Sequence, residues 1–241
     1  MPAALSTAPR VFTALPLAID PDEVLRFQGY KKSVDTPSPE VRALFDEALA
    51  LGRTLLAPQA VVRWLEVARV EADTVLAGGV TLTIPDVRRL WGPIEWVATA
   101  VCTIGDGLER RVAELWDARE LPLASMLDSV GSGAVESLAE YVNDLLCQEA
   151  IPVGLPVTNR VSPGYGDWDV TQQKALFALC SGDPIGVSLN EACFMSPVKS
   201  ISLLAAAGEH ARVDHYFSQC ARCWMRDCAY RRTPARKTVH R

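Results

Sequence analysis

The sequence predicts an α+β fold, a twisted, mainly antiparallel sheet flanked by helices. Two stretches rich in β-branched and apolar residues, 61–67 and 75–82, follow one another closely and are typical of strands. A third stretch, 95–103, is rich in valine and alanine, which indicates a buried strand. Strands and helices are interleaved without a regular strand–helix–strand alternation, so the pattern favours antiparallel strands with helices packed around them.

The helices are predicted from capping residues and from apolar spacing. Ser38 precedes a proline, and because proline is favoured at the first position of a helix, a helix should begin directly after Ser38. Two further helices are expected at about 106–119 and 121–147, where apolar residues recur at helical spacing. The glycines at 131 and 133 mark the point where the second of these would be broken. Gly78 and Gly79 fall inside the second strand pattern.

Composition limits the class of protein. The chain has 241 residues and a net charge of -5, which fits one sizeable domain and argues against a nucleic-acid partner held mainly through phosphate contacts. No apolar run is long enough for a membrane span and no signal peptide is evident, so a cytoplasmic location is expected. We expect a flexible leader at 1–19, one domain at 20–210 and a cysteine-rich C-terminal tail at 211–241.

A candidate binding motif lies between Arg160 and Trp168, where the sequence reads RVSPGYGDW. Pro163 fixes its own φ and Gly164 can adopt backbone angles closed to other residues, so the pair predicts a tight turn. That turn would hold Arg160 and Tyr165 in a fixed relation. Because a guanidinium binds a carboxylate through two parallel hydrogen bonds, Arg160 is suited to an anionic ligand.

The helix expected at 121–147 has two distinct faces. One face is an apolar stripe and predicts core contact. The other carries Glu136, Glu140 and Asn143 at helical spacing. A solvated acidic face is the ordinary interpretation of such carboxylates.

Several ordered motifs together resemble one known family. Arg160, Gly164 and Tyr165 match an Arg-x-x-x-Gly-Tyr signature, and an amphipathic helix at 171–179 follows it. Residues 186–202 then match the pattern Gly-x-x-Leu-x-Glu-x-x-x-Met-x-Pro-x-x-Ser-x-Ser. In this order the motifs resemble the AdoMet-binding activation domain of cobalamin-dependent methionine synthase, whose fold is also α+β.

The resemblance implies a role for each matched residue. It implies that Arg160 clamps the carboxylate of S-adenosylmethionine (AdoMet), and that Glu136, rather than Glu140, contacts the ammonium or sulfonium side. It places Tyr165 beside the reactive methyl group, as the candidate catalytic residue. The implied backbone contacts to the adenine come from Ser162, Pro163 and Gly164. The family has a further acidic AdoMet contact in its N-terminal part, for which Asp20 and Asp22 are the candidates.

The function implied by the resemblance is that of a stand-alone reactivation subunit. It would support reductive methylation of cob(II)alamin to methylcobalamin as a component of methyltransferase activity, not as a complete enzyme. The implied partners are a cobalamin-binding methionine synthase or a related corrinoid methyltransferase, and an electron donor, with no nucleic acid or membrane. Two alternatives stay open: a non-redox regulatory protein that binds AdoMet or a corrinoid, and a metal-stabilised interaction module whose AdoMet site has decayed.

A second signal is the C-terminal pattern C-x2-C-x4-C. Three thiolates in so short a segment can converge on one metal, and either Zn²⁺ or an Fe–S cluster would require a fourth ligand. An Fe–S cluster could deliver the electron that reactivation needs, whereas the alternative interpretation is three reduced thiols. The cysteines of the pattern are Cys220, Cys223 and Cys228, and the candidate fourth ligands are His215, Cys193 and Cys180.

Overall fold

The computed structural model describes residues 5–31 and 34–213 and has an α+β architecture. A six-stranded sheet has the order β4-β3-β2-β5-β8, with β1 also paired to β2, and all its pairings are antiparallel. The predicted fold class is therefore confirmed. The strands are β1 (Arg10–Thr13), β2 (Gln59–Val70), β3 (Thr74–Ala77), β4 (Val80–Thr83), β5 (Trp96–Thr103) and β8 (Ser200–Ala207). A separate two-stranded ribbon joins β6 (Ser188–Leu189) and β7 (Met195–Ser196).

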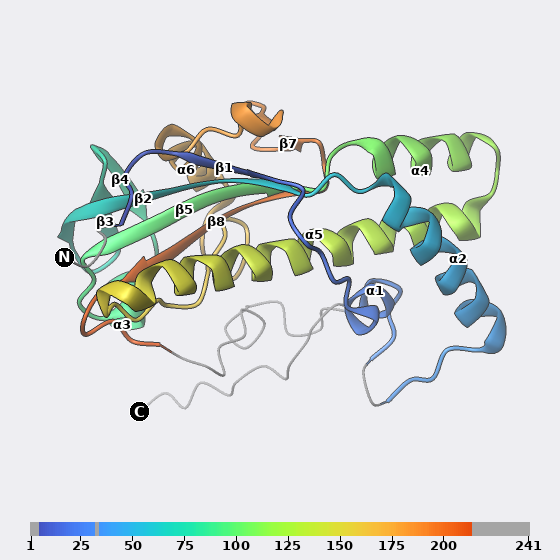
Figure 1. The fold of residues 1–241 in the computed structure, drawn as a ribbon, viewed down its shortest axis with the longest axis horizontal. Helices are drawn as coiled ribbons and strands as arrows, with labels where there is room; N and C mark the ends of the chain where they lie inside the picture. Colours follow the sequence, from blue (N-terminus) through green and yellow to red (C-terminus); the bar gives the residue numbers. More distant parts are fainter. Residues whose placement is uncertain (1–4, 32–33, 214–241) are drawn as a thin grey trace.

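Helices cover both faces of this sheet (Figure 1). The longest, α5, runs along one face, with α1, α2 and α4 packed against it, while α6 lies on the opposite face. The helices are α1 (Pro21–Phe27), α2 (Pro39–Leu55), α3 (Val87–Trp91), α4 (Gly107–Asp117), α5 (Leu121–Ala150) and α6 (Gln173–Leu179). Short 3-10 turns occur at Ile151–Val153, Val170–Gln172 and Asp183–Ile185. Within the described part of the chain, no helix is both long and apolar enough to cross a bilayer.

The predicted start of α2 is confirmed. The Ser38 hydroxyl accepts a hydrogen bond from the backbone N–H of Val41 at 3.4 Å, and Pro39 occupies the first helical position. This serine satisfies one of the backbone donors that a helix start leaves without an intrahelical partner.

Residues 10–13 correct the expectation of an irregular leader over 1–19. They form β1, which pairs with the first half of β2 in the register Arg10 to Val62. Arg10 also donates a hydrogen bond to Glu149 near the end of α5. A four-residue strand has too little periodicity to be recognised alone, and it forms here because β2 supplies the hydrogen-bonding partner.

Gly78 and Gly79 correct a second expectation, because they form the turn between β3 and β4 instead of lying within one strand. Both have positive φ, +55° and +77°. A two-residue hairpin turn with positive φ at both positions matches the right-handed twist of the flanking strands.

The helix α5 is continuous over Leu121–Ala150, without the break expected at its two glycines. A Cβ placed on Gly131 would lie 2.7 Å from Leu108 Cδ2 of α4. A Cβ on Gly133 would lie 2.8 Å from Val24 Cγ2 of α1. Both distances are shorter than a van der Waals contact, so these glycines allow two neighbouring helices to approach α5 closely.

The side chains of the central strands alternate between two apolar layers, as the period of a strand requires. One layer joins the sheet to α5 and includes Ala98, Ala100 and Ala205, whose small side chains leave room for the helix. The opposite layer contains Val97 and Leu204 together with the apolar face of α6. Strand β8 is thus buried on both faces, and β5 is buried except at its first residue.

Candidate ligand site at the edge of the sheet

An irregular segment covers the outer edge of β8 and positions Arg160. Val157 pairs with Ala207 and Val161 pairs with Leu204. The two pairs are four residues apart along the edge segment but only three residues apart along β8. The extra residue makes a local bulge, and bulges redirect the side chains next to them. Arg160 lies in this bulge, with its side chain 5% exposed and its guanidinium hydrogen-bonded to carboxylates of α5.

The predicted turn follows directly. Tyr165 N–H donates to the carbonyl of Ser162 at 3.2 Å, with Pro163 and Gly164 at the two central positions. Gly164 has φ +87°, close to the value of about +80° at the third position of a type II turn. Its own N–H donates to the carbonyl of Trp168 at 2.8 Å, closing the loop. The turn therefore fixes where Tyr165 leaves the backbone relative to Arg160.

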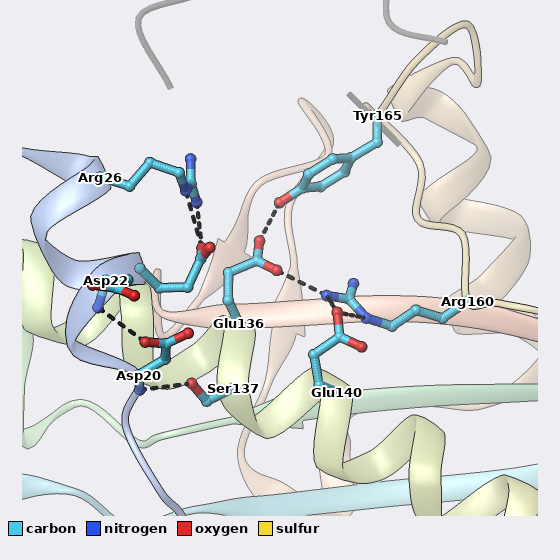
Figure 2. Close-up of polar contacts among 9 residues, drawn as sticks. Asp20, Asp22, Arg26, Glu136, Ser137, Glu140, Arg160 and Tyr165 are labelled. Carbon is cyan, nitrogen blue, oxygen red and sulfur yellow. Dashed lines mark hydrogen bonds and ion pairs between the residues drawn. The ribbon is translucent and has the colours of Figure 1, made fainter. Parts of the chain in front are cut away.

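Four side chains meet where this segment faces α5 (Figure 2). Arg160 Nη2 donates to Glu136 Oε2 at 2.8 Å and to Glu140 Oε1 at 2.8 Å. Arg160 Nε donates to the same Glu140 oxygen at 3.2 Å. The Tyr165 hydroxyl donates to Glu136 Oε1 at 2.7 Å. Each oxygen of the Glu136 carboxylate is thus bonded to a different residue of the edge segment.

Burial differs sharply between the two carboxylates. The Glu136 side chain is 8% exposed, whereas that of Glu140 is 57% exposed. Desolvation by itself opposes the charged form of Arg160, but attraction to Glu140 and Glu136 outweighs it, so the net pKa of Arg160 is raised. Arg160 therefore stays charged, and with both carboxylates ionised these three groups carry one net negative charge.

The N-terminal end of α1 lies beside the same part of α5 (Figure 2). The backbone N–H of Asp20 donates to Oγ of Ser137, the residue after Glu136, at 3.5 Å. The Asp20 carboxylate accepts from the backbone N–H of Asp22 at 2.9 Å and so caps α1. Of the two acidic candidates in the N-terminal part, Asp20 thus has a structural role, and both residues are exposed.

The structure brings together Glu136, Arg160 and Tyr165 from the sequence-derived site. Ser162 and Pro163 are buried in the turn beside them. The sequence analysis missed the contact of Glu140 with Arg160. Part of the signal was available, because residues four apart on a helix share one face and a group that reaches Glu136 can also reach Glu140. That Arg160 faces this helix was not available from the sequence.

The predicted metal ligands Cys220, Cys223 and Cys228, with His215, lie outside the described residues. Cys180 and Cys193, the other candidate ligands, are buried free thiols. Burial raises the pKa of Cys180 to about 11, which keeps its thiol protonated near neutral pH. Within residues 5–31 and 34–213, no three His, Cys, Asp or Glu side chains are grouped so that they could hold a metal ion.

Comparison with known proteins gives one informative kind of match. No protein-family model and no curated protein matches this chain. Among solved structures, the chain is similar to the crystal structure of the MetH reactivation domain bound to AdoHcy, with a TM-score of 0.61 and 15% sequence identity. The match covers 90% of this chain and 83% of that one. At this identity the likeness concerns the fold, and the chain has the fold of the MetH reactivation domain.

Proposed function

We propose that the protein is an AdoMet-binding reactivation module for a cobalamin-dependent methyltransferase. The observation that carries the proposal is the hydrogen-bonded cluster of Tyr165 with the buried Glu136 and Arg160, with Glu140 at its edge. The cluster combines residues far apart in the sequence, and the fold around it is that of the MetH reactivation domain, which was solved with AdoHcy bound.

The charges of the cluster suit AdoMet. The ligand carries a carboxylate, an ammonium and a sulfonium, and thus one net positive charge, opposite to that of the two glutamates with Arg160. Arg160 provides planar donors for the ligand carboxylate, and Glu136 provides an acceptor for a cationic group. Tyr165 is 43% exposed although its hydroxyl is held by Glu136, so its ring can lie at the mouth of the site.

The chemistry proposed for the complex is methyl transfer from the AdoMet sulfonium to cobalamin on a partner, with one electron from a reductant and AdoHcy as product. The residues of this chain supply binding and orientation. None of them needs to accept a proton, because methyl transfer from a sulfonium releases a neutral thioether. The contribution of the site is therefore positional, and Tyr165, held on both sides by the turn and by Glu136, is the residue proposed to orient the methyl group.

Calorimetric titration with AdoMet tests the proposal. Arg160→Ala should weaken binding by about 2–5 kcal/mol, because the ligand carboxylate then has no charged partner in a partly buried site. Glu136→Gln should also weaken it, since a cationic group loses its counter-charge. Arg110→Ala is the matched control: Arg110 is a surface arginine, 69% exposed, in an ion pair on α4. Circular dichroism confirms that each variant is folded.

Equal AdoMet affinity for the wild type and a folded Arg160→Ala protein would remove the proposed carboxylate clamp. Reactivation itself is tested with a cob(II)alamin-loaded methyltransferase, AdoMet and a one-electron reductant, followed by the visible spectrum. The module should be required for the appearance of methylcobalamin, and Tyr165→Phe should slow the reaction more than it weakens AdoMet binding.

The proposed metal site is tested separately. Anaerobic purification should give iron and sulfide if the three C-terminal cysteines hold a cluster, and zinc without visible absorption if they hold a structural ion. Single Cys→Ser changes at any of them should lose the metal in either case. Protein with neither metal would leave the cysteines as ordinary thiols and favour an electron supplied directly by another protein. The cysteines concerned are Cys220, Cys223 and Cys228.

A further inference from the structure

One of the two edges through which Arg160 can bind a carboxylate in a bidentate manner is already in use. Nε and Nη2 form one side of the guanidinium, and both donate to the same oxygen of Glu140, at 3.2 and 2.8 Å. A carboxylate binds an arginine most strongly through two parallel hydrogen bonds to such an edge. A ligand carboxylate approaching this edge would therefore meet the carboxylate of Glu140.

The two glutamates differ in how firmly they are held. Glu136 is buried, and it accepts hydrogen bonds from Arg160 and from the Tyr165 hydroxyl. Both of its carboxylate oxygens therefore have a partner that replaces water. Glu140 is 57% exposed, and both of its hydrogen bonds among the described residues go to Arg160. Because its side chain reaches solvent, water weakens its attraction to Arg160 and can solvate this carboxylate when the pair opens. Of the two carboxylates, Glu140 is the one that a ligand can displace at little cost.

We propose that Glu140 is a specificity-determining residue that competes with the ligand carboxylate for Arg160. This inference rests on the proposed function and concerns the same site. Glu140 lowers the affinity for adenosyl ligands that carry an amino-acid carboxylate, and leaves unchanged the affinity for adenosyl ligands that lack one. Its rotation into solvent accompanies the entry of the carboxylate.

Long-range electrostatics alone predicts the opposite change in AdoMet affinity, so the direction of the change distinguishes the two explanations. AdoMet carries one net positive charge, so removing any nearby negative charge should weaken its binding through the long-range field. Competition at Arg160 predicts tighter binding when the Glu140 charge is removed. The matched control is Asp144, an exposed acidic residue one turn further along α5.

The experiment compares the wild type, Glu140→Gln and Asp144→Asn by calorimetric titration with AdoMet and with 5′-methylthioadenosine, which lacks the amino-acid group. Glu140→Gln should bind AdoMet about three- to tenfold more tightly, because the ion pair between Arg160 and the exposed Glu140 no longer has to be broken. Its affinity for 5′-methylthioadenosine should equal that of the wild type. Asp144→Asn should bind AdoMet no more tightly than the wild type.

Two results would overturn the inference: unchanged or weaker AdoMet binding by Glu140→Gln, or equal tightening for both ligands. A ligand-free measurement separates this failure from failure of the proposed function. The ¹⁵N–¹H resonance of Arg160 Nε should move in Glu140→Gln and stay in place in Asp144→Asn. If the resonance moves but the folded wild type and variants all fail to bind AdoMet, the proposed function is wrong, and so is the competition that depends on it. If it does not move, the Glu140 contact is absent in solution and the inference fails alone.

Discussion

Replacing Arg160 by methionine tests how strongly burial separates the two ion pairs of the site. Methionine keeps an apolar stem but removes the guanidinium, leaving the 8% exposed carboxylate of Glu136 without this charged partner. Breaking a buried pair in this way costs about 3–5 kcal/mol. Adding Glu136→Gln removes the buried charge, so the double variant should be more stable than the two single losses would predict. The expected coupling between Arg160 and Glu136 is about 2–3 kcal/mol.

The coupling between Arg160 and Glu140 should be much smaller, at about 0.5 kcal/mol, because Glu140 is 57% exposed and water replaces its partner. Urea unfolding followed by circular dichroism measures both couplings, from two double-mutant cycles that share Arg160→Met. Unchanged m-values would show that the unfolded states are comparable. Equal couplings, or a larger one for Glu140, would show that burial does not decide the strength of these pairs.

Two further predictions concern the core. Gly133→Ala should lower the free energy of unfolding by about 1–3 kcal/mol, because the added Cβ would meet Val24 Cγ2 at 2.8 Å and outweigh the better helix propensity of alanine; a more stable variant would contradict the close packing of α1 on α5. Burial raises the pKa of Cys102 from 9.0 to about 12, so this thiol contributes stability below pH 9 that is lost as the pH rises toward 12. Cys102→Ala should therefore lose stability less steeply than the wild type between pH 9 and 11, by up to about 1.4 kcal/mol per pH unit; parallel pH profiles would contradict the raised pKa.

Features determined by local sequence were predictable. The type II turn at Pro163-Gly164 follows from the fixed φ of proline and the positive φ available to glycine, and the start of α2 follows from the Ser38 cap. The mostly apolar sequence of β5 likewise indicated a buried strand. In each case the information lies within a few residues.

Features determined by distant partners were not predictable. The strand β1 exists because β2 offers it an open edge, and Gly133 stays helical because its missing Cβ admits Val24 of α1. The pairing of Arg160 with Glu140 needs a further fact, namely that the bulged segment along β8 faces α5. Neither spacing nor composition contains that fact, although the positions of Glu136 and Glu140 on one helix face made it testable.

The segment that supplies Arg160 also covers the outer edge of β8, so its sequence must preserve this pairing as well as the position of Arg160. All eight residues of β8, Ser200–Ala207, are buried, and an uncovered apolar edge of this kind is a template for pairing with another chain. A substitution that loosens residues 156–161 would therefore expose an aggregation-prone strand as well as disturb the site. Evolution of ligand preference in this protein should consequently proceed through side chains on α5, such as Glu140, which can change without uncovering the sheet.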